Sequence, residues 1–141
     1  MWKIVVSVLG PTLLIATNAV AQPVIDSVLF AQGQQLYQDH CALCHRDAGT
    51  GNPPRFPALS GNDLLENPSQ IVNTIREGAG TMPPFPDLTA PEIAAVATYI
   101  RNAWVNSFGR VTNTETAAML EELEVGGYVA SVWDGVFTEA Q

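Results

Sequence analysis

The sequence predicts an all-α fold, and three observations lead to that class. Apolar residues recur at helical spacing in several segments, which are separated by stretches rich in glycine and proline. Capping signals mark where these segments begin and end. No two alternating segments are joined by a tight-turn signal, so no β-hairpin is expected. With 141 residues, the chain is one small domain or one domain with a tail.

Residues 1–21 have the layout of a secretory signal peptide. One lysine precedes a mostly apolar run from Ile4 to Ile15, and Ala19-Val20-Ala21 offers a small-x-small cleavage site. A membrane anchor is the alternative, but the apolar run falls short of the about 20 residues that a spanning helix needs. We therefore expect cleavage after Ala21 and export to the periplasm, with membrane attachment only if the segment is kept.

The mature chain is strongly acidic. The whole sequence has 6 basic and 14 acidic residues, and loss of Lys3 with the signal leaves 5 arginines, which changes the formal charge from −8 to −9. Nucleic-acid binding needs a basic surface, so that class of partner is not expected. The charge suits a basic protein partner or serves solubility alone.

Two helices and a long loop are expected in the first half of the mature chain. Ser27 is the expected N-cap of a helix that runs to about His40. Residues 46–62 are expected to be loop, because RDAGTGNPPRFPALSGN shows no sustained period. A second helix is expected to begin at Ser69 and to stop at Gly78.

Two further helices are expected in the second half. The capping box TAPE, residues 89–92, opens what should be the longest helix. Its apolar stripe consists of Ile93, Val96, Ala97, Ile100 and Trp104. Thr114 is the expected cap of a last helix that ends near Glu124, and the final stretch GGYVASVWDGVFTEAQ is expected to be extended or irregular. The predicted organisation is a signal peptide over residues 1–21, a main domain over 22–110, and a helix with an irregular tail over 111–141.

The pentapeptide CALCH, Cys41 to His45, contains both cysteines of the chain. A redox dithiol usually sits in an α/β context, which is not predicted here. A structural zinc ion needs four ligands, and the only further cysteine or histidine is the adjacent His40. C-x-x-C-H is the signature of covalent haem attachment, in which each thiol adds to a vinyl group and the histidine lies under the iron. The sequence therefore predicts one covalently bound haem c, held by Cys41, Cys44 and His45.

Met82 is the predicted second axial ligand of the haem iron. Met1 leaves with the signal, and Met119 lies within the last predicted helix, where a methionine typically fills an apolar gap. Met82 lies in GAGTMPPFPD, where glycines allow a close approach and prolines stiffen the chain. Ligation by His45 and Met82 would close both faces of the iron and raise its potential. A five-coordinate haem enzyme or sensor, with Met82 merely nearby, is the alternative.

These motifs resemble the class I cytochromes c over residues 33–106. The matching text is GQQLYQDHCALCH, the G-x-G-x-P run of GTGNPPRFPAL, the MPPF loop and PEIAAVATYIRNAW. The resemblance implies three to four helices around a haem, with the first and last long helices crossing at Gly33 and Tyr37 stacking near Tyr99.

The resemblance also implies that a proline carbonyl in the haem loop accepts the Nδ1 proton of His45. Pro53 is the best positional match, and Pro57 is the alternative. A bond of this kind fixes the imidazole and tunes its basicity.

The text MPPF…LT…EIAAVATYIRNAW is similar to small cytochrome subunits or domains of periplasmic dehydrogenases, including quinoprotein alcohol dehydrogenases. This implies an electron carrier rather than an enzyme, with a dehydrogenase as donor and an oxidase or another cytochrome as acceptor. A docking subunit of a multi-haem dehydrogenase complex remains an alternative. The chain departs from the family at Val105, where glycine is usual, and the tail beyond Arg110 lies outside the match.

The predictions for other residues are less specific. His40 is expected on the surface, and Arg55 either reaches a haem propionate or is simply solvated. Trp104 and Phe108 are expected in the core. Three aromatic residues of the tail either dock on a partner or cover the core: Tyr128, Trp133 and Phe137.

Overall fold

The computed structural model describes residues 26–138, with side chains for residues 26–127, so the expected signal peptide lies outside the described residues. The elements are α1 (Ser27–His40), α2 (Ala42–His45), the 3₁₀ helix η1 (Asp63–Glu66), α3 (Pro68–Glu77), α4 (Ala90–Asn102) and α5 (Asn113–Thr138). Within residues 26–138 there is no strand, only isolated bridges, so the all-α class is confirmed. No helix of this part of the chain is long and apolar enough to cross a membrane.

The first helix has the expected span, but its cap is one residue earlier than predicted. The carboxylate of Asp26, not the hydroxyl of Ser27, accepts the backbone N–H of Val28 at 2.9 Å. An aspartate in this place is as good a cap as serine, and it also complements the positive end of the helix dipole. The helix ends at His40, as expected.

The loop over residues 46–62 and the helix after it also agree with the sequence. The turn η1 was not anticipated, because four residues are too few to show a period. The N-cap of α3 is Asn67, whose side chain accepts two backbone N–H groups, and Pro68 fits the first helical turn. Gly78 ends α3 with a φ of 76°, a conformation that glycine adopts at little cost.

The helix α4 opens with the predicted capping box. The carboxylate of Glu92 accepts the backbone N–H of Thr89 at 2.8 Å and its hydroxyl at 2.6 Å. All residues from Ile93 to Arg101 are buried, so this helix is the centre of the fold. It ends at Asn102, and Trp104 therefore lies just outside it.

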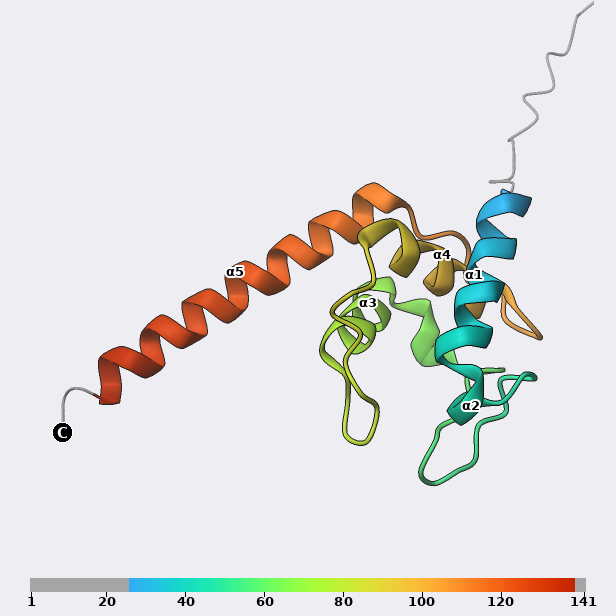
Figure 1. Ribbon diagram of the computed structural model, residues 1–141, viewed down its shortest axis with the longest axis horizontal. Coiled ribbons are helices and arrows are strands. Elements are labelled where there is room, and N and C mark those ends of the chain that lie inside the picture. Colours follow the sequence, from blue (N-terminus) through green and yellow to red (C-terminus); the bar gives the residue numbers. More distant parts are fainter. Residues whose placement is uncertain (1–25, 139–141) are drawn as a thin grey trace, which may run out of the picture.

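The crossing of α1 and α4 is the main packing contact of the body (Figure 1). A Cβ atom added at Gly33 would lie 2.1 Å from the carbonyl oxygen of Ala95, so the two backbones touch there. The rings of Tyr37 and Tyr99 lie with centroids 5.4 Å apart, but their planes are tilted by 46° and are not stacked. The close approach at Gly33 and the proximity of the two tyrosines are therefore confirmed, whereas the stacked geometry is not.

The last helix differs from its prediction in extent. It begins at Asn113 rather than Thr114 and continues to Thr138, so the irregular tail expected after Glu124 is wrong, and α5 rather than α4 is the longest helix. The glycines at 126 and 127 suggested a break, but a glycine costs a helix only about 1 kcal/mol, and no proline follows. The first part of α5 packs on α3 and α4, and the rest extends away from the body (Figure 1).

Candidate functional site

The single helical turn α2 brings both thiols and the imidazole of CALCH to one cavity. The backbone N–H of His45 donates to the carbonyl of Cys41 at 2.9 Å, which closes the turn. Positions three and four apart on a helix share a face, so Cys41, Cys44 and His45 line the same cavity. Leu43 lies off that face and is 88% exposed. The thiols are free and partly buried.

His45 is buried, and its ring is held by the loop that follows it. Its Nδ1 donates to the carbonyl oxygen of Pro57 at 3.0 Å. This bond leaves the lone pair of Nε2 available for a metal ion. The sequence-based preference for Pro53 as the acceptor of the His45 proton is therefore wrong, and the alternative, Pro57, is the acceptor.

The course of the loop explains why Pro57 and not Pro53 reaches the imidazole. Asn52 and Phe56 pair through two backbone hydrogen bonds of 2.8 and 3.2 Å, which places Pro53 in the exposed turn between them. After that turn the chain returns toward His45. The N–H of Gly51 donates to the carbonyl of His45 at 2.8 Å, and a Cβ added at Gly51 would lie 2.5 Å from the Pro57 oxygen.

Met82 lies on a loop fastened to α3. Two backbone hydrogen bonds of 3.1 and 2.9 Å join Ala79 and Met82 in a tight turn, and the N–H of Phe85 donates to the carbonyl of Ile75 at 2.9 Å. A Cβ added at Gly78, where φ is positive, would lie 2.5 Å from the carbonyl oxygen of Met82. The glycine thus permits the close approach that was expected of this loop.

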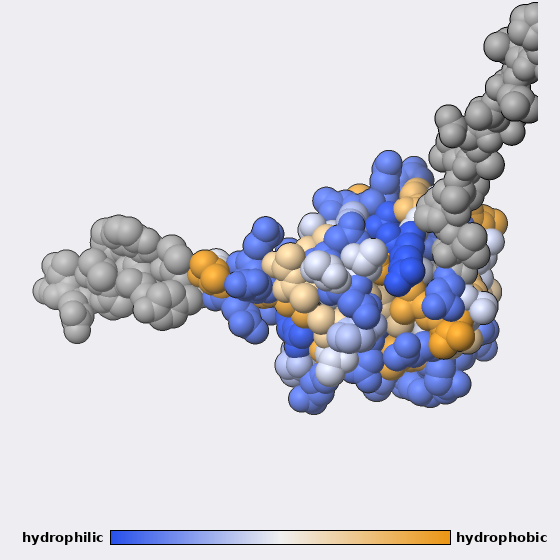
Figure 2. Space-filling view, turned by 90° about the horizontal axis from the view of Figure 1, so that it is seen from above, coloured by the Kyte–Doolittle hydropathy of each residue, from blue (hydrophilic) through white to orange (hydrophobic). Residues whose placement is uncertain are grey.

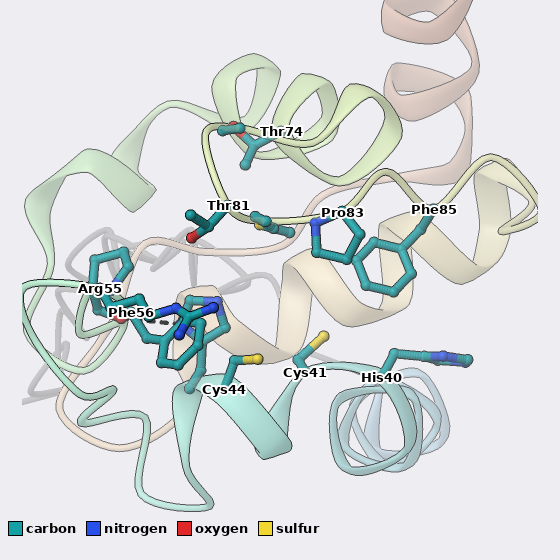
Figure 3. Close-up of a pocket in the computed structure, with 13 residues that line it drawn as sticks. His40, Cys41, Cys44, Arg55, Phe56, Thr74, Thr81, Pro83 and Phe85 are labelled. Carbon is teal, nitrogen blue, oxygen red and sulfur yellow. Dashed lines mark hydrogen bonds between the residues drawn. The ribbon is translucent and has the colours of Figure 1, made fainter.

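Two adjoining cavities of about 170 and 220 Å³ separate α2 from the Met82 loop. Cys41 and Cys44 lie on one side of the first cavity, and Thr81 and Pro83 lie on the other (Figure 3). The residues that line both cavities are Cys41, His45, Pro57, Thr74 and Met82. The rest of the second cavity is mainly apolar, with side chains that include Leu65, Ile71, Ile75 and Ile100. Met119 lines neither cavity and packs against the core, as expected.

The electrostatics of the cavity walls differ from those of the whole chain. Burial, and then the neighbouring Cys44, raises the pKa of the Cys41 thiol to about 11. Among the residues that line the two cavities there is no carboxylate, and Arg55 is the cation. Its guanidinium lies 5.2 Å from the centroid of the Phe56 ring. His40 is exposed, as predicted, with its ring edge-on to Phe85.

The residues present fit a covalently attached haem. The group needs two thiols three positions apart, an adjacent imidazole and an apolar crevice, and these converge on one cavity. The oriented imidazole and the thioether of Met82 are a donor set that iron accepts. The sequence-predicted residues Cys41, Cys44, His45 and Met82 are thus brought together.

Sequence reasoning missed Asn106, which fastens the loop after CALCH to the end of α4. Its side-chain oxygen accepts the N–H of Gly61 at 2.8 Å, and its amide donates to the carbonyls of Leu59 at 2.9 Å and Ile100 at 2.7 Å. Trp104 makes a second connection to this loop, since its Nε1 donates to the carbonyl of Asp47 at 3.0 Å. The available signals were a polar residue soon after an apolar stripe and the end of the family resemblance at Asn106, and neither reveals partners more than 40 positions away.

Comparison with known proteins places these residues in a family context. Residues 29–100 match the family model described as cytochrome c oxidase, cbb3-type, subunit III. The cytochrome c subunit of the quinone alcohol dehydrogenase of Gluconacetobacter polyoxogenes is 36% identical over 121 residues, which cover 74% of this chain and 25% of that protein. The corresponding subunit of Gluconobacter oxydans is 29% identical and covers 67% of this chain and 22% of its own length.

A smaller relative matches along nearly all of its length. Cytochrome c6 of Cyanidium caldarium is 30% identical over 105 residues, which cover 71% of this chain and 93% of that protein. The chain therefore spans about a quarter of the alcohol dehydrogenase subunits but almost a whole small cytochrome.

Proposed function

Since the chain belongs to the cytochrome c family, whose members transfer single electrons, we propose that it is an exported monohaem electron carrier. The observation that carries this proposal is the convergence of Cys41, Cys44, His45 and Met82 on one apolar cavity. Each thiol would form one thioether bond to the haem by addition to a vinyl group, and His45 and Met82 would hold its iron. When bound, the haem supplies a reversible one-electron couple at its iron.

The protein's own residues prepare the site for this chemistry. The bond from His45 to Pro57 orients the imidazole. The turn that joins Ala79 and Met82 holds the thioether on a fastened loop, so little conformational entropy is lost when it ligates. Apolar walls, including Ile71 and Ile100, limit the access of water and so influence the reduction potential.

The proposed donor is a periplasmic dehydrogenase, and the proposed acceptor is an oxidase or another cytochrome of the respiratory chain. The alcohol dehydrogenase relatives support the donor, and the description of the matching family model supports the acceptor. Export rests on the signal-like pattern of residues 1–21. Because those relatives are named as subunits, the second candidate is a docking subunit of a dehydrogenase complex, and copurification of this chain with a dehydrogenase would favour it.

Covalent attachment is tested by substitution of the thiols. In the wild-type protein, the haem absorbance should remain with the polypeptide through acid-acetone extraction. Cys41→Ala and Cys44→Ala should each lower the yield of folded haem protein severalfold, and the double variant should retain no covalent haem. Leu43→Ala, between the two thiols but exposed, is the matched control and should keep wild-type haem content. Transfer of the wild-type colour to the solvent would refute the proposal.

An enzyme or sensor with five-coordinate haem gives a different spectrum. The proposed carrier should show low-spin oxidised iron and a thioether-to-iron charge-transfer band at long wavelength. High-spin iron that readily binds carbon monoxide in the wild-type protein would favour the enzyme or sensor instead.

A further inference from the structure

The outer part of α5, residues 124–138 and here called the α5 arm, leaves the body of the molecule (Figure 1). The inner part of the helix is fastened by the buried Thr116 and by the partly buried Met119. In the arm, Val125 is 58% exposed, and Cβ atoms added at Gly126 and Gly127 would meet nothing within 4 Å.

The arm is poorly able to sustain a helix without help. Two consecutive glycines in a helix each cost about 1 kcal/mol relative to alanine. A helix of this length is only marginally stable in water on its own, since most helices depend on packing of one face. A helix that is continuous through Gly126 and Gly127 therefore points to a surface that packs against the arm.

The charge of α5 limits which kind of surface can pack against the arm. Two acidic residues lie in the arm, Glu124 and Asp134, and three more precede it on the same helix, Glu115, Glu121 and Glu122. The helix contains neither lysine nor arginine. Hydrophilic residues also dominate the described part of α5 visible outside the body in Figure 2. A second copy of this chain, with a formal charge of −8, would repel the arm, and so would an anionic lipid surface.

The sequence of the arm adds an apolar component. Tyr128, Val129, Val132, Trp133, Val136 and Phe137 follow the two glycines. Aromatic residues are typical anchors of protein interfaces, and a helix commonly binds another protein by lying in an apolar groove. Acidic residues beside such anchors fit a groove with a basic rim.

We propose that the α5 arm docks as a helix into an apolar groove with a lysine- and arginine-rich rim on the dehydrogenase that donates electrons to this cytochrome. The inference rests on the proposed function, which supplies the identity of the partner. The arm holds the cytochrome on its donor through a surface separate from the residues that line the haem cavity.

Site-specific photo-crosslinking in the full-length protein, expressed in its native host, tests this contact. A photoreactive residue replaces Val125, and the control replaces Val28, which is 72% exposed on α1. The Val125 position should yield an adduct with a quinoprotein dehydrogenase subunit, and the crosslinked peptide should contain basic and apolar residues. The Val28 position should not. The yield should fall severalfold at high ionic strength, where exposed charges are screened.

Charge variants provide the second measurement. The pair Glu121→Gln and Glu122→Gln removes two exposed charges from the turn of α5 that immediately precedes the arm, and it should lower the adduct yield severalfold at low salt. Asp63→Asn, an exposed acidic residue of η1, is the matched control and should leave the yield unchanged.

Four outcomes would overturn the inference. They are an adduct between two copies of this chain, an adduct with lipid alone, the same products from Val125 and Val28, and no adduct. The covalent haem and the visible spectrum are measured on the same samples. If no crosslink forms while the haem is intact, the docking of the arm is contradicted and the proposed function is not. If the wild-type protein carries no covalent haem, the proposed function itself is contradicted.

Discussion

His45 illustrates how one residue depends on distant backbone. Its N–H is held locally by the carbonyl of Cys41, but its ring is oriented by Pro57, twelve positions further along the chain. That carbonyl arrives in place because Asn52 and Phe56 close the intervening turn. The imidazole is thus oriented by the folded loop itself, which reduces the ordering that ligation of a metal would require.

Substitution of Met82 should remove one of the two proposed protein ligands of the haem iron. Met82→Ala should lower the reduction potential by on the order of 0.1 V, within the roughly 0.8 V that axial ligands span. It should also let the ferrous protein bind carbon monoxide. Spectroscopy and redox titration measure both effects. Met119→Ala is the control, since Met119 packs against the core and lines neither cavity, and its spectrum should be that of the wild type. The reverse pattern would show that Met119 is the ligand.

At the scale of elements, α4 is the central helix of the body, and its two ends are held in different ways. Its start is a local device, the capping box of Thr89 and Glu92. Its end is held by long-range contacts, in which Asn106 ties the loop at Leu59 and Gly61 to the carbonyl of Ile100. The face between these ends packs on α1 and helps to line the second cavity, of about 220 Å³.

The capping box predicts that the free energy of unfolding decreases at acidic pH. Hydrogen bonds from the side chain and then the backbone of Thr89 lower the pKa of Glu92 below its ordinary value of 4.5. The unfolded state therefore binds this proton more readily than the folded state does, so the contribution is complete above pH 4.5 and is lost as pH falls through the folded pKa.

Glu92→Gln tests this contribution. The variant should be less stable than the wild type at neutral pH and should lose less stability on acidification, measured by denaturant unfolding at pH 7 and below pH 4.5. Glu77→Gln, at an exposed position of α3, is the control. Parallel pH curves for wild type and Glu92→Gln would contradict the prediction.

The crossing of α1 and α4 makes Gly33 one of the least replaceable residues. In Gly33→Ala the new methyl group would lie 2.1 Å from the Ala95 oxygen, so the helices must separate, and we expect a loss of at least about 2 kcal/mol in unfolding free energy. Gly126→Ala is the matched helical control. It meets nothing within 4 Å and should be neutral or stabilise α5 by up to about 1 kcal/mol. Equal effects of the two substitutions in thermal melts would show that the crossing is not close-packed.

At the scale of the whole molecule, the body of the protein includes the start of α5. Thr98 and Val111 exchange two hydrogen bonds of 3.0 and 3.2 Å, and Val111 and Thr116 are fully buried. The boundary expected at Arg110 therefore cuts through the core, whereas the α5 arm lies beyond it.

Two truncations test this division. A chain ending after Arg110 loses Val111 and Thr116 from the core and should be destabilised by about 3 kcal/mol or more. A chain ending after Leu123 keeps those contacts, and its melting temperature should stay within a few degrees of the full-length value. Equal melting temperatures for the two truncations would place the start of α5 outside the cooperative core.

The sequence by itself determined the chemistry of the site, because the pattern that encodes it is local. Both thiols and the imidazole lie within five residues, so one helical turn suffices to gather them. The capping box of α4 and the stop at Gly78 were predictable for the same reason, since a helix end depends on neighbouring residues. Met82 was predicted from elimination among three methionines together with the glycines and prolines of the loop that contains it.

The tertiary structure alone decided the features that depend on contacts between distant residues. The choice of Pro57 over Pro53 follows from the path of a loop without periodicity, and the role of Asn106 follows from hydrogen bonds across more than 40 positions. The full length of α5 was also beyond the sequence, because the cost of Gly126 and Gly127, about 1 kcal/mol each, is too small for a local pattern to decide whether a helix continues. Local patterns specify groups that are neighbours in the chain, whereas the partners of a loop or of a long helix are selected by packing of the whole molecule.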